Sequence, residues 1–137
     1  MTALLKSKTL SLSINCTPDR LYEFVSHPEN LPEWAKAFCR SVRKSNGEWI
    51  VETPRGPVKI RFVKKNECGV LDHYIRPSPG VEIFVPMRVI PNGNGSEVLF
   101  TLFRQAGMTD ENFAEDIRWV DSDLKNLKMA MEKRQGA

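Results

Sequence analysis

The last third of the chain carries a single apolar stripe with helical spacing. Its members recur at steps of three and four residues: Phe113, Ile117, Val120, Leu124, Leu127 and Met131. Side chains at these steps share one face of an α-helix. Thr109 is the expected N-cap, with acidic residues directly after it and Lys133 and Arg134 near the opposite end, which suits the helix dipole. Such a helix buries its stripe on the elements that precede it.

Alternating apolar and polar residues predict a run of strands before this helix. We expect strands over 8–15, 39–45, 58–62, 70–76, 81–89 and 98–102, with a further one around Trp49 and Val51. Asn46-Gly47 and the segment 92–95 have the composition of hairpin turns. Within 81–89, Pro86 lacks a backbone donor, so we expect a bulge or a locally unpaired stretch there.

Two short helices are predicted between the first and second strands. Thr17 is a suitable N-cap for the first, with Pro18 at its first helical position, and Pro32 begins a second helix that runs to Phe38. The order of elements is therefore one strand, two short helices, six strands and one long helix. This order predicts an α+β fold in which the long helix lies on an antiparallel sheet.

The composition is that of an ordinary globular domain. The chain has 137 residues, 41% of them hydrophobic and 27% charged, which indicates one domain over 1–137. A net charge of +3 gives no argument for nucleic-acid binding. The sequence has no run apolar enough for a membrane span, and residues 1–9 lack the apolar segment of a secretory signal, so we expect a cytoplasmic protein. Three widely spaced cysteines without CxxC spacing are expected to be reduced thiols.

Strong catalytic signatures are missing from the sequence. The two histidines, His27 and His73, lie 46 residues apart and give no zinc or iron signature. Neither a Gly-x-Ser-x-Gly elbow nor a glycine-rich phosphate loop occurs. We therefore expect no metal and no cofactor. The basic residues around Lys59 and Arg61 are expected to form a solvated outer face of the sheet.

With this order of elements, the chain resembles the SRPBCC superfamily, also described as START-like or polyketide cyclase/dehydrase-like. The segment from Thr17 to Trp34, with its Pro28-Glu-Asn-Leu-Pro-Glu-Trp34 stretch, is similar to the opening helices of that family. The resemblance covers about residues 8–133 and implies a helix-grip fold, in which a curved antiparallel sheet of seven strands wraps around the C-terminal helix. It also implies an elongated cavity between sheet and helix. Members bind lipids, sterols, polyketides, quinones or hormones there, and a minority catalyse reactions.

The resemblance and the strand alternation together suggest the walls of such a cavity. Trp34, on the second short helix, lies near the entrance and either covers it or packs the helix pair. Trp119 lies off the stripe, at the flank of the sheet or at a dimer contact. The expected wall residues are Trp49, Val58, Ile60, Phe62, Ile83, Val85, Met87, Phe100 and Leu102 from the sheet, and Phe113, Ile117, Val120 and Leu124 from the helix.

His73 is the polar residue best placed for a ligand contact. Strand alternation puts it on one face with Leu71 and Ile75, and puts Asp72 and Tyr74 on the other, while the inward face stays open. His73 is either a satisfied core histidine or a ligand contact. His73, Tyr74 and Asp72 are also weak candidates for acid–base chemistry.

Three functions are compatible with these features. The first is binding or transport of a small hydrophobic or amphipathic ligand, such as a lipid, a polyketide or a quinone, by a monomer or homodimer. The second is an aromatase/cyclase-type enzyme that uses the same cavity. The third is a protein-interaction module of the co-chaperone type. An apolar cavity favours the first, converging polar groups favour the second, and a filled interior with an exposed apolar patch favours the third.

Overall fold

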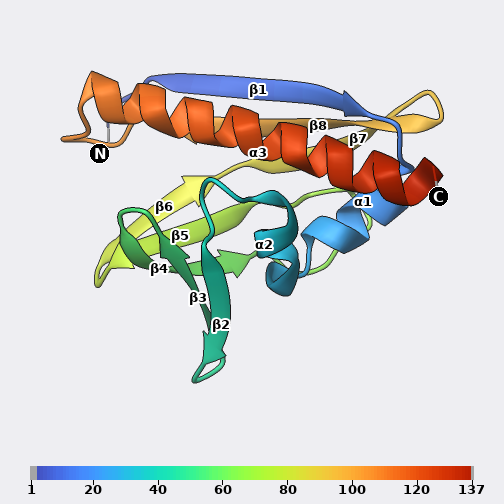
Figure 1. Cartoon of the computed structure of the whole chain (residues 1–137). Coiled ribbons are helices and arrows are strands. Elements are labelled where there is room, and N and C mark those ends of the chain that lie inside the picture. Colours follow the sequence, from blue (N-terminus) through green and yellow to red (C-terminus); the bar gives the residue numbers. More distant parts are fainter. Residues whose placement is uncertain (1–2, 137) are drawn as a thin grey trace.

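The computed structural model describes residues 3–136 as short helical segments, eight strands and one long helix (Figure 1). β1 (Ser7–Ile14) is followed by α1 (Pro18–Val25), the 3-10 helix η1 (Pro28–Asn30) and α2 (Leu31–Trp34). The strands that follow are β2 (Ser41–Ser45), β3 (Glu48–Thr53), β4 (Gly56–Phe62), β5 (His73–Ser78), β6 (Val81–Val85), β7 (Met87–Asn92) and β8 (Gly95–Phe103). The long helix α3 spans Asp110–Gly136.

The strands form two antiparallel sheets. One sheet has the order β1-β8-β7, and the other has the order β2-β3-β4-β5-β6. Figure 1 shows α3 running beside β1 and across the five-stranded sheet, with α1 and α2 near its C-terminal half. The helix contacts both β1 and α2. The predicted α+β class and long C-terminal helix are confirmed, whereas the single sheet of seven strands is wrong, because the described chain has eight strands in two sheets.

Pro86 is the reason for the additional strand. The predicted strand 81–89 divides at this residue into β6, which pairs with β5, and β7, which pairs with β8. Pro86 has no N–H to donate, although its carbonyl accepts a hydrogen bond from the Thr101 N–H at 3.0 Å. The interruption expected at this proline is confirmed. Its consequence is that one continuous run of chain belongs to both sheets.

The predicted strand 70–76 also starts later than expected, at His73. The residues before it pair with β7: the Leu71 N–H donates to the Met87 carbonyl at 2.8 Å, and the Val89 N–H donates to the Gly69 carbonyl at 2.9 Å. Simple alternation fails here because the segment changes its pairing partner from one sheet to the other. We call residues 69–72 and 85–89 the seam, since they join the two sheets.

The short helices begin near the predicted residues but end early. Pro18 is the first residue of α1, and Thr17 holds the N-cap position without a side-chain capping bond. A helix is predicted from Pro32 to Phe38, whereas α2 ends at Trp34. In a longer helix, the Ala37 and Phe38 amides would donate to carbonyls four residues back. They donate instead to the carboxylate of Asp123 on α3, which holds the loop 35–40 against that helix.

The apolar stripe of α3 is buried for most of its length. Phe113, Leu124, Leu127 and Met131 are buried, whereas Ile117 and Val120 are half-buried. The C-terminal part of the stripe belongs to the core that α1, α2, β1 and β8 also form. Toward its N-terminal half the helix faces a cavity. Within residues 3–136, neither α3 nor any other helix is long and apolar enough to cross a membrane.

Candidate functional site

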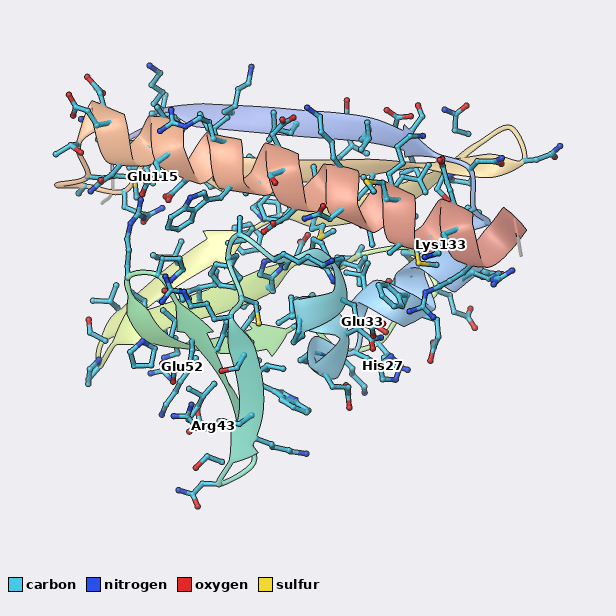
Figure 2. The ribbon with its side chains drawn as sticks, in the orientation of Figure 1. His27, Glu33, Arg43, Glu52, Glu115 and Lys133 are labelled. Atoms are coloured by element: carbon cyan, nitrogen blue, oxygen red, sulfur yellow. The ribbon has the colours of Figure 1, made fainter. Side chains whose placement is uncertain are left out.

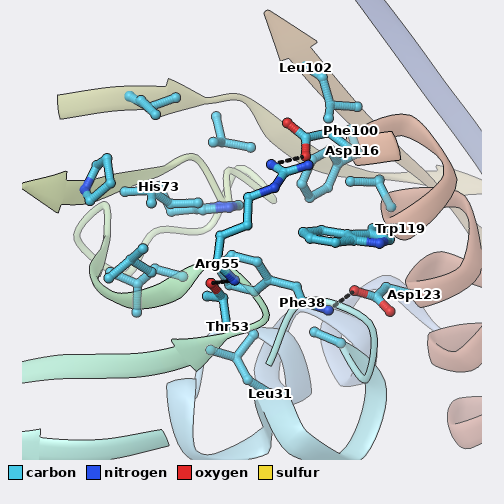
Figure 3. Close-up of a pocket in the computed structure, with 18 of the residues that line it drawn as sticks. Leu31, Phe38, Thr53, Arg55, His73, Phe100, Leu102, Asp116, Trp119 and Asp123 are labelled. Atoms are coloured by element: carbon cyan, nitrogen blue, oxygen red, sulfur yellow. Dashed lines mark hydrogen bonds and ion pairs between the residues drawn. The ribbon is translucent and has the colours of Figure 1, made fainter. Parts of the chain in front are cut away.

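A cavity of about 280 Å³ lies between the inner face of the five-stranded sheet, the α2 segment, β8 and α3 (Figure 3). Its size is near the lower end of the range of roughly 300–1,000 Å³ that is typical of small-molecule sites. Its walls are mainly aliphatic and aromatic. The predicted residues that line it are Trp34, Val58, Ile60, Phe62, His73, Ile83, Val85, Phe100, Leu102 and Val120.

The register of the five-stranded sheet explains why these side chains share one cavity. Ile60 pairs with Ile75, which pairs in turn with Ile83. Residues that are directly opposite each other in antiparallel strands point to the same side of the sheet. The inward face of β5 is therefore the one that carries His73 and Ile75. Tyr74 lies on the opposite face, where the Arg61 guanidinium is 4.6 Å from the centre of its ring.

Five predicted wall residues lie outside this cavity: Trp49, Met87, Phe113, Ile117 and Leu124. Met87 follows Pro86 into the three-stranded sheet and is buried in the core. Trp49, at the hairpin end of β3, lines a separate hollow beside Lys59 and Arg61. Phe113 and Leu124 are buried by packing. α3 therefore faces the cavity mainly with residues that lie beside its apolar stripe, because most of the stripe is packed against the rest of the fold.

Besides His73, the polar part of the wall comes from residues that were not predicted from the sequence. Asp116, Trp119 and Asp123 lie at steps of three and four on α3, and Arg55 lies opposite them. The helical spacing of the three was visible in the sequence, but two aspartates beside a stripe are typical of a solvated flank. The remaining unselected residues of the wall are Leu31, Ala35, Phe38, Thr53, Pro57, Ile75, Pro77, Phe84, Phe103, Gln105 and Met108.

Arg55 links the sheet to α3 across one end of the cavity (Figure 3). Arg55 lies in the turn between β3 and β4. Its Nη2 is 2.6 Å from Glu115 Oε1, and its Nη1 is 2.7 Å from Asp116 Oδ1. The guanidinium carbon lies 4.6 Å from the centre of the Trp119 ring. The Thr53 hydroxyl accepts the Arg55 N–H at 3.1 Å and donates to the Gly56 carbonyl at 2.7 Å, which fixes the turn. We call Arg55 with its three partners the Arg55 bridge.

Asp123 is the second carboxylate of the cavity wall, and only 4% of its surface is exposed. Its Oδ1 accepts the Ala37 N–H at 2.8 Å, and its Oδ2 accepts the Phe38 N–H at 3.2 Å. Burial raises the pKa of Asp123 to about 6, although the two amide hydrogen bonds act in the opposite direction. Among the described residues no Lys, Arg or His forms an ion pair with it.

His73 contributes a neutral polar group to the wall. The side chain is 5% exposed and packs between Phe62 and Phe100, with ring-centre distances of 4.9 and 5.8 Å. Its Nδ1 lies 3.0 Å from the Leu71 carbonyl oxygen, so Nδ1 carries the proton and donates it. Burial lowers the pKa of His73 to about 4, which keeps the ring neutral at pH 7. Nε2 is then an acceptor.

The other two candidates for acid–base chemistry do not line the cavity. Tyr74 is on the outer face of the sheet, and Asp72 belongs to the seam. Asp72 accepts hydrogen bonds from Arg88 Nε at 3.0 Å, from Arg88 Nη2 at 2.8 Å and from the Met87 N–H at 2.9 Å. The hydrogen bonds from Arg88 lower the pKa of Asp72. This carboxylate joins the two sheets, and its geometry gives no support for a catalytic role.

The outer face of the five-stranded sheet carries paired charges. Arg43 Nη1 lies 2.6 Å from Glu52 Oε2, and both residues are labelled in Figure 2, on the side of the sheet away from α3. Lys59 Nζ lies 3.0 Å from Glu48 Oε1. Lys59 and Arg61 are exposed, as the alternation of β4 predicts.

The sequence matches no family model and no curated protein. The fold, in contrast, is similar to several solved structures. XoxI from Bacillus cereus has a TM-score of 0.77 at 18% identity, with 96% of this chain and 99% of that chain covered. For the Aha1 dimer from Colwellia psychrerythraea, the TM-score is 0.71 at 16% identity, with coverages of 93% and 97%. For Ara h 8.0201, the TM-score is 0.70 at 15% identity, with coverages of 95% and 99%.

These neighbours fit the helix-grip fold that the resemblance implied. Identities this low show a shared fold alone, because one fold hosts many functions. Membership of the SRPBCC superfamily therefore stays a prediction, and the function must be argued from the cavity.

Proposed function

We propose that the protein binds a small apolar or amphipathic molecule in the cavity between the five-stranded sheet and α3. The observation that carries this proposal is a mainly apolar cavity of about 280 Å³ with a few polar groups in its wall. A cavity with this pattern is the usual form of a small-molecule site. Its volume suits a compact ring system or a short single chain better than a lipid with two long chains.

The driving force would come from apolar area removed from water. Burial of about 200 Å² of ligand surface at roughly 25 cal/mol per Å² gives about 5 kcal/mol before the cost of immobilising the ligand is subtracted. His73 Nε2 and the carboxylate of Asp123 are the polar groups that would orient the ligand. The ligand-contact role predicted for His73 remains part of this proposal.

Catalysis is less well supported than binding. An acid–base reaction needs a donor and an acceptor that converge on one substrate atom. The polar side chains of this wall are each engaged separately: His73 with the Leu71 carbonyl, Asp116 with Arg55, and Asp123 with two amides. An interaction module would be expected to have a filled interior, and the cavity argues against that alternative.

Replacing Ile75 by Trp should weaken binding of an apolar fluorophore, N-phenyl-1-naphthylamine, by about tenfold, or about 1.4 kcal/mol. Ile75 lies on the inner face of β5, so an indole there would fill space that the fluorophore needs. Tyr74→Trp is the control, because it adds bulk to the same strand on the outer face. Fluorescence titration of the two variants and the unchanged protein measures the effect.

Two results would overturn the proposed function. One is the absence of saturable fluorophore binding together with no compound in an organic extract of the freshly purified protein by mass spectrometry. The other is an equal loss of affinity in the Ile75→Trp and Tyr74→Trp variants, which would place the fluorophore elsewhere on the protein.

A further inference from the structure

We infer that the cavity is built for a ligand with a protonated amine, whose charge pairs with Asp123. This inference rests on the proposed function and narrows it from apolar or amphipathic molecules in general to cationic amphiphiles. Three observations carry it: a buried carboxylate without a counter-charge, an aromatic ring beside that carboxylate, and the way in which the same wall already holds a cation.

The first observation is the state of Asp123. A carboxylate that is 4% exposed has lost most of its hydration, which is costly unless another charge compensates. Its two hydrogen bonds come from the neutral backbone amides of Ala37 and Phe38. An ionised carboxylate offers about four acceptor positions, so two hydrogen bonds leave capacity for a further donor. An ammonium group supplies both the missing donors and the missing charge.

The second observation is the arrangement of the wall on α3. Trp119 lies between two acids, three residues after Asp116 and four residues before Asp123, so all three share one side of the helix. Figure 3 shows the indole between the two carboxylates. A cation over an indole face with a carboxylate beside it gains cation–π attraction and ion pairing together.

The third observation is that a cation of the protein already occupies the side of Trp119 that faces Asp116. The Arg55 guanidinium lies 4.6 Å from the Trp119 ring centre and 2.7 Å from Asp116 Oδ1. Arg55 thus shows the chemical group that the indole and an aspartate accept on this wall. Asp123 lies on the other side of the same indole and has no such partner among the described residues.

The charges of the lining oppose an anionic ligand. Of the described residues around the cavity, Arg55 carries the fixed positive charge, and it is bound to Glu115 and Asp116. His73 is neutral at pH 7 because burial lowers its pKa to about 4. A ligand carboxylate would therefore be repelled by the negative charge of Asp123. An alcohol would not be repelled, but it would supply no positive charge to pair with Asp123.

Three probes with one naphthyl group test the inference: 2-(1-naphthyl)ethylamine, 2-(1-naphthyl)ethanol and 1-naphthylacetic acid. Each competes with N-phenyl-1-naphthylamine at pH 7.5. We expect the amine to bind about tenfold or more tightly than the alcohol, and the acid to bind most weakly. The Asp123→Asn variant should bind the amine no better than the alcohol. Asp121→Asn is the control, because Asp121 is an exposed residue of the same helix that pairs with Lys125 at 2.8 Å.

A second measurement is needed if Asp123→Asn fails to fold because the loop 35–40 is no longer held against α3. In the unchanged protein, the preference for amine over alcohol should fall about tenfold between pH 7.5 and pH 5 as Asp123 takes up a proton. The nearby Cys39 thiol, whose pKa burial raises to about 11, and His73 both titrate outside this interval. Burial also raises the pKa of Asp116. The Asp116→Asn variant tests whether Asp116 causes the pH dependence, and we expect this variant to keep it.

The outcomes separate this inference from the proposed function. If the fluorophore and the alcohol bind but the amine binds no better, the inference fails while the proposed function stands. A pH-independent amine preference, or a preference that survives Asp123→Asn, also overturns the inference. If neither the fluorophore nor any of the three probes binds, and the organic extract holds no compound, the proposed function fails together with the inference.

Discussion

Replacing Gly69 by Ala is expected to lower the free energy of unfolding by about 4 kcal/mol. A Cβ atom at this position would lie 2.2 Å from the Val89 carbonyl oxygen and 3.3 Å from its carbon. Both are backbone atoms of β7, so no side-chain rotation relieves the contact. The φ angle of Gly69 is +72°, a conformation that costs an L-residue about 1–2 kcal/mol even in open space. The seam would have to open for the variant to fold.

Gly80→Ala is the matched control for this variant. Gly80 has a φ of +79°, and a Cβ added there would meet no atom of the described residues within 4 Å beyond its own chain neighbours. The control therefore reports the cost of the left-handed conformation alone, about 1–2 kcal/mol. Urea unfolding followed by tryptophan fluorescence gives both values. Equal losses in the two variants would show that the Gly69 backbone and β7 are not in close contact.

The sequence was sufficient to predict the elements that depend on local pattern. The stripe from Phe113 to Met131 and the Asn46-Gly47 turn, where both residues have positive φ, correspond to α3 and the β2–β3 hairpin. The seam was not predictable in the same way. Its hydrogen bonds join Gly69 to Val89 and Leu71 to Met87, and alternation carries no information about which strand a segment will pair with.

The residues of the cavity wall also fall into those that local pattern predicts and those that it does not. The sheet residues of its wall, such as Ile60 and Ile83, alternate along strands and were identified from the sequence. Asp116, Trp119 and Asp123 were not identified, because a flanking position on a helix becomes interior only when a curved sheet passes over it. The polarity of the two aspartates argued for solvent, and Trp119 was expected at the flank of the sheet or at a dimer contact, although in the folded protein these three residues form the most distinctive chemistry of the wall.

Replacing Asp72 by Ala is expected to lower the free energy of unfolding at pH 7 by about 3 kcal/mol. The variant leaves the buried Met87 N–H without its acceptor and removes both hydrogen bonds from Arg88. Most of the loss should come from the amide, since the Arg88 side chain is half exposed and its charge is screened by solvent. Glu82→Ala is the control: this exposed residue lies 3.6 Å from Arg61 and 3.9 Å from Arg76, and its loss should cost about 0.5 kcal/mol or less.

The pH dependence of this difference identifies the charged form of Asp72 as the stabilising one. Hydrogen bonds from Arg88 hold the pKa of Asp72 below its ordinary value, so the ionised group contributes stability above about pH 4. That contribution is lost as the pH falls through the lower pKa of the folded state. Urea unfolding at pH 7 and at pH 2.5 should therefore show a smaller gap between the unchanged protein and Asp72→Ala at the acidic pH. A gap that widens on acidification would contradict the seam role, because a carboxylate held by Arg88 and the Met87 amide stabilises the fold through its negative charge.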